Sequence, residues 1–301
     1  MELRKKYLWL ILLAALLIVY GQSLMLSGFL LALREGIEAA LVISIALSVL
    51  KKMGRMDQAK RVWLGAGSAG LVALAVAVLL NLIGAEFEGA GEQIFEGVTM
   101  VAAAGALTWM IFWMKKHGRH MQVGMEANLK DALSNGQGWA LFSLAFFAVL
   151  REGVELALFL TAIDFSAAPD GGGTTTLGWV GGLLGLLAAA VIGEMIFDAA
   201  ARTDLRHFFR YTTLLLIVFA AGLVGHAIHE FNELGWVPNV IERLYDLTAV
   251  LPESSAAGQF LKSMFGYNAD PSLTEAAGYV AYMTAAFYFL THRQATDAKR
   301  P

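Results

Sequence analysis

The sequence predicts an all-α, polytopic membrane protein with seven transmembrane helices, built as a 3+3 inverted repeat plus one and preceded by an N-terminal signal-like segment. Three observations lead to this prediction. Of the 301 residues, 57% are hydrophobic and only 16% are charged, whereas soluble domains carry about a quarter charged residues. Seven apolar stretches are long enough to cross a bilayer as helices, which takes roughly 20 residues each. In addition, a motif of twelve residues occurs twice.

The seven apolar stretches are separated by connections whose charge alternates. They cover residues 24–50, 62–84, 96–114, 139–163, 177–199, 211–231 and 275–291. Lys and Arg follow the first, third and fifth stretches, and neither occurs between the second and third or between the fourth and fifth. Because basic loops stay in the cytoplasm, we expect a multi-pass protein of the cell (inner) membrane whose core begins outside and whose C-terminus is cytoplasmic.

The N-terminal residues 1–23 need a separate interpretation. Three basic residues, Arg4 to Lys6, precede an apolar run from Tyr7 to Tyr20. As a helix this run would reach about 21 Å, which is short of the roughly 30 Å hydrocarbon core. The pattern therefore favours a signal-like segment over an extra N-terminal hydrophobic span.

The remaining chain divides into a transmembrane domain at 24–291 and a cytoplasmic tail at 292–301. Within the domain we expect repeat one at 24–114, repeat two at 139–231, an outer interfacial segment at 232–274 and the seventh helix at 275–291. In the interfacial segment, apolar residues between Val240 and Leu247 follow Pro238 and alternate with charges. This pattern predicts an amphipathic helix lying outside the membrane.

The repeated motif places charged residues deep in two apolar stretches. Leu33–Ser44 reads LREGIEAALVIS and Leu150–Thr161 reads LREGVELALFLT, which are identical at seven of twelve positions and lie 117 residues apart. Three spans separate the starts of the copies, so the copies run in opposite directions through the membrane. Inverted repeats of this kind commonly hold a substrate site near the midplane.

Each copy contains Arg-Glu-Gly-x-Glu, whose charged residues are Arg34, Glu35, Glu38, Arg151, Glu152 and Glu155. At 100° per residue the three charges of one copy project into one sector of a helix. A charge at the bilayer centre costs roughly 2.5–3.5 kcal/mol, so these groups must face one another or water. Two carboxylates for each arginine leave a formal charge of about −2. That surplus favours a hard metal cation held by the four glutamates, with the arginines as supporting ion pairs.

An ion-pair network that only holds helices together is the alternative for this motif. A second acidic group is expected at the outer side, where it would concentrate cations unless its members are merely solvated. Its candidates are Glu96, Glu233, Glu86, Glu88, Glu92, His226, His229 and Glu230. The order His226, His229, Glu230 matches no zinc-protease motif. We therefore predict no catalytic residue and no enzyme activity.

On these motifs the sequence resembles the high-affinity iron permease family, with its fungal iron permeases and bacterial Efe-type ferrous iron permeases. The resemblance runs from about Met25 to the seventh stretch and includes IFEGVTMVAAAGALTWMIFWMKK and FAAGLVGHAIHEFNELG. It implies a permease importing iron, Fe2+ or Fe3+, as a transported substrate without a cofactor, through a pathway lined by both motifs. It also suggests Glu96 and Glu233 as further candidates.

The resemblance further implies a protein partner, namely a periplasmic or extracellular iron-binding protein or an iron-oxidising enzyme, while the chain itself contacts the lipid bilayer. No nucleic-acid partner is expected. Three alternatives remain open, and lead enters the first of them through the family resemblance. One is an importer of another metal such as lead or manganese, one is a membrane-embedded metalloenzyme, and one is a metal sensor without flux.

Overall fold

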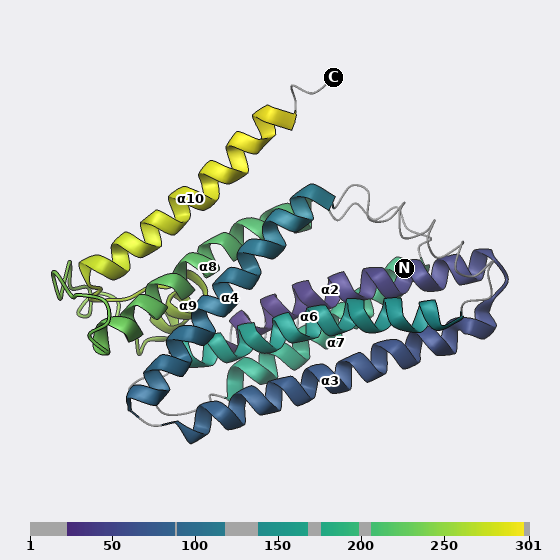
Figure 1. The fold of residues 1–301 in the computed structure, drawn as a ribbon, viewed down its shortest axis with the longest axis horizontal. Coiled ribbons are helices and arrows are strands. Elements are labelled where there is room, and N and C mark those ends of the chain that lie inside the picture. Colours follow the sequence, from purple (N-terminus) through teal and green to yellow (C-terminus); the bar gives the residue numbers. More distant parts are fainter. Residues whose placement is uncertain (1–22, 88, 118–137, 168–175, 199–205, 298–301) are drawn as a thin grey trace.

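The computed structural model describes residues 23–87, 89–117, 138–167, 176–198 and 206–297. In these ranges the chain forms eight α-helices, one short 3-10 helix and no strand (Figure 1). The elements are α2 (Ser23–Lys52), η1 (Met56–Gln58), α3 (Ala59–Glu86), α4 (Ala90–His117), α6 (Gly138–Ala167), α7 (Thr176–Asp198), α8 (Arg206–Glu233), α9 (Ala256–Phe265) and α10 (Leu273–Asp297). The signal-like segment lies almost wholly outside the described residues, and α10 continues into the predicted tail.

Four of the described helices are long and apolar enough to cross a membrane. Their candidate spans are Met56–Gly84, Ala90–Trp113, Leu177–Met195 and Tyr211–Glu233. The helices α2 and α6 have 30 residues each, which is ample length, but each carries the three charges of one motif near its middle. The apolar spans are typical of an integral membrane protein, while the count of seven spans stays a prediction.

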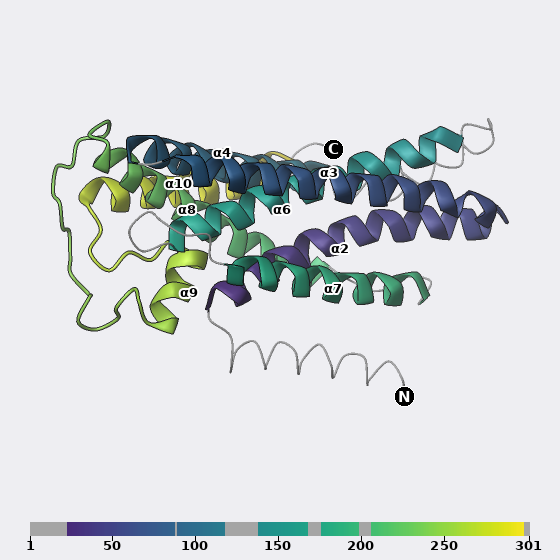
Figure 2. The same ribbon diagram turned by 90° about the horizontal axis from the view of Figure 1, so that it is seen from below.

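Two parallel helix pairs form the centre of the bundle. In the first, α7 lies against α2, and contacts advance together along both helices: Gly181 meets Met25, Gly185 meets Phe29, and Gly193 meets Ala40. In the second, α6 lies against α3 in the same way, since Gly65 meets Phe142, Ala73 meets Gly153, and Gly84 meets Phe165. Figure 2 shows α2 beside α7 and α3 beside α6.

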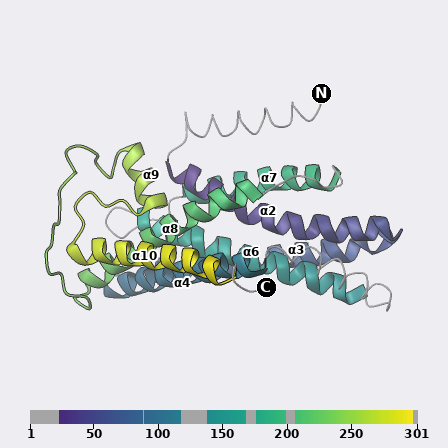
Figure 3. The same cartoon turned by 90° about the horizontal axis from the view of Figure 1, so that it is seen from above.

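The two motif helices meet between these pairs and run in opposite directions. A short turn through η1 joins α2 to α3, so these helices are antiparallel, and α6 follows the direction of α3. Helices α4 and α8 pack antiparallel on one side, with Gly97 of α4 against Phe231 of α8. Residues that include Met110, Phe159 and Phe219 form the buried core there. Helix α10 lies along this layer (Figure 3), where Tyr282 hydrogen-bonds Thr108.

The predicted amphipathic helix between Val240 and Leu247 is wrong, because residues 234–255 are irregular. The amide of Leu244 donates to the Pro271 carbonyl and that of Leu247 to the Ala269 carbonyl, both at 2.8 Å. These amides therefore bond a neighbouring segment instead of a preceding helical turn, and Pro238 supplies no amide at all. The helix of this region is α9, which begins after Ser255, whose side chain accepts from the Gly258 amide, and ends at Gly266 with φ 66°.

Polar contacts join helix α9 to α2 and to the segments that precede and follow it. The hydroxyl oxygens of Ser263 and Ser27 lie 2.7 Å apart. The Glu253 carboxylate, in the segment before α9, binds Lys262 Nζ at 2.8 Å and accepts from the Ala269 amide at 2.8 Å. Glu253 thus ties the irregular segment to the helix and to the chain that follows it.

The docking of α9 should depend on pH through Glu253. Partial burial alone would raise the pKa of Glu253, but the hydrogen bonds from Lys262 and from the Ala269 amide leave it below its usual value. A carboxyl whose pKa is lower in the folded than in the unfolded protein stabilises the fold fully at a pH above its unfolded-state pKa. This stabilisation is lost as the pH falls through the folded-state pKa. We therefore expect the protection factors of the α9 amides, which compare their hydrogen exchange with that of an unstructured peptide at the same pH, to decrease below the ordinary glutamate range. The Glu253→Gln variant should lack this pH dependence, and an identical profile in both proteins would contradict the assignment.

Candidate metal centre

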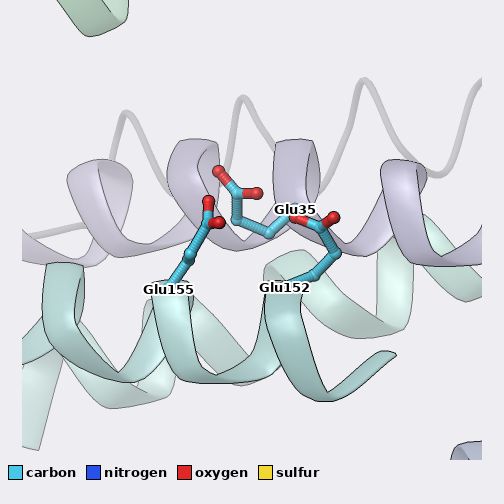
Figure 4. A group of neighbouring side chains, drawn as sticks. All are labelled: Glu35, Glu152 and Glu155. Atoms are coloured by element: carbon cyan, nitrogen blue, oxygen red, sulfur yellow. The ribbon is translucent and has the colours of Figure 1, made fainter. Parts of the chain in front are cut away.

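Three carboxylates from the two motif helices, those of the buried Glu35 and Glu155 and of the half-buried Glu152, converge at the centre of the bundle. Each of Glu35, Glu152 and Glu155 offers one oxygen, and these oxygens lie within 4.8 Å of one another. Figure 4 shows the side chains directed toward one another, Glu35 from α2 and the other two from adjacent turns of α6. The cluster therefore forms where the antiparallel helices α2 and α6 bring their motifs together.

The carboxylates of this cluster are buried without full hydrogen bonding. One oxygen each of Glu35, Glu152 and Glu155, the Oε2 atom, is buried and has no hydrogen-bond partner among the described residues. The side chains of Glu35 and Glu155 are 1% and 8% exposed. Because a buried polar atom without a partner costs free energy, three such oxygens at one point favour a bound cation. Oxygen donors of this kind suit hard divalent and trivalent ions.

Arg34 is enclosed and doubly paired. Its guanidinium lies 2.5 Å from Glu35 Oε1 and 2.6 Å from Glu38 Oε1, and its Nη1 lies 3.4 Å from the sulfur of Met110 on α4. The whole residue is 1% exposed. Arg34 therefore fixes both glutamates of its own copy and joins α2 to α4.

Arg151 has a different environment although it occupies the same motif position. Its Nε lies 2.9 Å from Glu155 Oε1, and its side chain is 25% exposed. Its guanidinium stacks over the rings of Trp109 and Trp113, at 5.0 and 4.6 Å from their centroids, distances at which cation–π attraction is effective. The two copies are thus chemically equivalent in sequence but not in structure.

The arginines flank the carboxylates on opposite sides along the helix axes. On α2, Arg34 precedes Glu35 on the side where α9 docks. Because α6 runs the other way, Arg151 lies on the side away from α9. The three carboxylates therefore lie between the enclosed Arg34 and the partly exposed Arg151.

The structure brings together three of the four predicted metal ligands. Glu38, the fourth, is engaged by Arg34 and does not belong to the group of three, although its carboxylate interacts electrostatically with that of Glu155. Met110 contacts Arg34, and Trp109 and Trp113 contact Arg151, and none of these contacts was predicted from the sequence. The spacing of the tryptophans, four residues apart, places both on one helix face and was the available signal.

The predicted outer group is split by the structure. Glu96 is buried and interacts electrostatically with Glu92, Glu230 and Glu233, so these four gather where α4 begins and α8 ends. Glu86 is exposed at the end of α3 and lies apart from this group. The two histidines have other partners. His226 lies 3.4 Å from the Lys262 carbonyl, and His229 lies 3.1 Å from Glu275 and 3.3 Å from Glu233. Glu88 lies outside the described residues. A role in recruitment stays a prediction.

Comparison with known proteins gives a consistent result over most of the chain. Residues 25–293 match the family described as "Iron permease FTR1 family". The chain is 37% identical over 269 residues to the ferrous iron permease EfeU of Yersinia pestis, covering 88% of this chain and 93% of that relative. It is 36% identical over 279 residues to ferrous iron permease EfeU of Escherichia coli O6:K15:H31, covering 90% and 98%. No solved structure is significantly similar.

Proposed function

Because the chain belongs to the iron permease FTR1 family, and is therefore an integral membrane iron transporter and not an enzyme, we propose that iron crosses the bilayer by way of the two Arg-Glu-Gly-x-Glu motifs. The observation that carries this proposal is the convergence of Glu35, Glu152 and Glu155, each with one buried oxygen that has no hydrogen-bond partner in the part of the chain that the structure describes. Glu38 would complete the ligand set when Arg34 releases it. The relatives are ferrous iron permeases by name, so Fe2+ is the proposed substrate.

The packing of the helices supports an inverted repeat whose halves interlock. An offset of 117 residues relates α2 to α6, α3 to α7 and α4 to α8. Under this relation the α2–α7 pair is equivalent to the α6–α3 pair. The motif glycines follow the same rule, because Gly36 packs on Ala189 of α7 and Gly153 packs on Ala73 of α3. A Cβ added at these glycines would lie only 2.5 and 2.6 Å from the alanine methyls. Each motif helix then has its partner in the other repeat.

The charge of the connections supports a core that begins outside and ends in the cytoplasm. In that orientation the cluster of Glu92, Glu96, Glu230 and Glu233 lies at the outer end, where its negative field would raise the local concentration of iron ions. Delivery of iron there by an iron-binding protein or an iron-oxidising enzyme stays a prediction.

Uptake of radiolabelled iron into proteoliposomes tests the pathway. We expect Glu35→Ala and Glu152→Ala to lower Fe2+ uptake by at least about tenfold, since even residues that only support metal ligands change affinity or activity by 10- to 100-fold. The matched control is Glu242→Ala, which removes an exposed glutamate from the irregular segment. Unchanged uptake in correctly inserted Glu35 and Glu152 variants would refute the pathway. Competition by Fe3+, Mn2+ and Pb2+ in the same assay identifies the preferred ion.

A further inference from the structure

A cavity of about 350 Å³ lies beside the metal centre, between α2, α3, α6 and α7. Its wall is mainly aliphatic and includes Leu74, Leu156, Leu183 and Leu186. The carboxylate residues Glu35 and Glu152 also line it. The cavity is therefore an apolar space that adjoins the proposed iron site on one side.

The cavity opens on the lateral surface of the bundle. Leu74 of α3 and Leu183 and Leu186 of α7 line the cavity and are at the same time 59%, 61% and 41% exposed. Helix α3 packs on α6 and helix α7 packs on α2, so the opening lies between the two parallel pairs. Glu35 and Glu152 lie well inside their helices, and at that depth the surroundings of a membrane protein are hydrocarbon.

We propose that this cavity binds an acyl chain of a bilayer lipid, which fills the apolar space and closes the lateral side of the metal centre. Water is a poor occupant, because an ordered water needs two to four polar partners and apolar cavities stay dry. A hydrated iron ion is equally unsuited to an aliphatic wall. An acyl chain matches the lining, the depth and the lateral opening. The sealing role rests on the proposed function, whereas binding of the chain does not.

Two glycines of α3 allow the cavity to be filled without disturbing the fold. A Cβ added at Gly70 or at Gly67 would have no neighbouring atom within 4 Å among the residues that the structure describes. Gly70 lines the cavity and Gly67 does not. Gly70→Phe therefore places a ring in the cavity, and Gly67→Phe makes the same change in the same helix at a site outside it.

The test is photocrosslinking in vesicles of dioleoyl phosphatidylcholine that contain a phospholipid with a diazirine on its acyl chain. Mass spectrometry of the wild-type protein should locate crosslinks at lining residues such as Leu74 and Leu183. Gly70→Phe should lower these crosslinks by about tenfold or more, because each methylene displaced from an apolar site reduces affinity. Gly67→Phe should leave them unchanged. Undiminished crosslinking in Gly70→Phe would overturn the proposal.

A second pair of variants gives the same information if Gly70→Phe fails to fold. Leu183→Gln makes the opening polar, and Leu82→Gln replaces a leucine of equal exposure, 61%, that does not line the cavity. Only Leu183→Gln should weaken crosslinking at the lining residues, and equal crosslinking in both variants would overturn the proposal.

Iron uptake in the same vesicles tests whether the cavity only closes the lateral side of the metal centre or is itself a path for iron ions. Both phenylalanine variants should retain uptake within about twofold of the wild-type level, because the ring replaces the acyl chain as the apolar filling. Selective loss of uptake in folded Gly70→Phe would show that ions use the cavity and would overturn the sealing role. The crosslinking measurement involves no iron, so a failure of the proposed pathway and a failure of lipid binding give different results.

Discussion

Replacing Arg34 by leucine is expected to destabilise the folded protein by about 3–5 kcal/mol, the range for removing one partner of a buried ion pair. Arg34 is 1% exposed and contacts the carboxylates of Glu35 and Glu38. Its loss leaves two enclosed carboxylates without their cation. The measurement is chemical unfolding in detergent micelles, followed by tryptophan fluorescence.

Arg151→Leu is the matched control for this prediction, because it makes the same change at the equivalent motif position. Arg151 is 25% exposed and lies 2.9 Å from one carboxylate, that of Glu155, with Glu152 at 4.0 Å, so its loss leaves one closely paired carboxylate where the loss of Arg34 leaves two. We therefore expect a smaller loss of unfolding free energy. Adding Glu38→Gln to Arg34→Leu should recover part of the stability, since removing both partners of a buried pair costs less than removing one. Equal losses for the two arginines would contradict their different environments.

Replacing Gly181 by leucine is expected to cost about 3 kcal/mol or more, at or above the upper end of the range for overpacking. A Cβ at Gly181 would overlap the carbonyl of Met25 on α2. Because the obstructing atom belongs to the backbone, no change of rotamer can relieve the overlap. Gly181 and Gly185 have the GxxxG spacing that brings membrane helices into close contact, so the substitution separates α7 from the helix that carries Arg34.

Gly67→Leu provides the control for Gly181→Leu. It replaces a helical glycine on α3 where an added Cβ meets nothing within 4 Å, and surface changes of this kind usually alter stability by no more than about 0.5 kcal/mol. The fraction of monodisperse protein after extraction and the unfolding midpoint in detergent measure both effects. Comparable stability of the two variants would show that α2 and α7 are not held by close backbone contact.

The local geometry of the motifs could be predicted from the sequence. Helical spacing alone places Arg34, Glu35 and Glu38 in one sector, and the structure pairs them. The pairing of Glu38 with Arg34 in place of the carboxylate cluster could not be predicted, because it depends on how Met110 and the rest of α4 enclose Arg34. Likewise, the spacing of Trp109 and Trp113 gives one helix face, but only the packing of α4 on α6 places Arg151 over it.

Other features depend on partners that are distant in the sequence. The apolar pattern between Val240 and Leu247 has helical spacing, yet its amides bond carbonyls near Pro271, and periodicity carries no information about such partners. The close helix contacts at glycines could not be predicted from the sequence for the same reason. The sequence contains Gly28 and Gly181, but it does not specify that their helices lie side by side.

The exchange of partners between the two repeats has a consequence for biosynthesis. Gly28 of α2 meets Gly178 of α7, which is synthesised 150 residues later. At about 5–20 residues per second, α2 waits roughly 8–30 s for the helix that covers it. Until Glu155 has been synthesised the first motif lacks the carboxylates of the second copy, and until α7 follows it also lacks its packing partner. The metal centre and the helix that covers α2 are therefore complete only after translation of the fifth stretch.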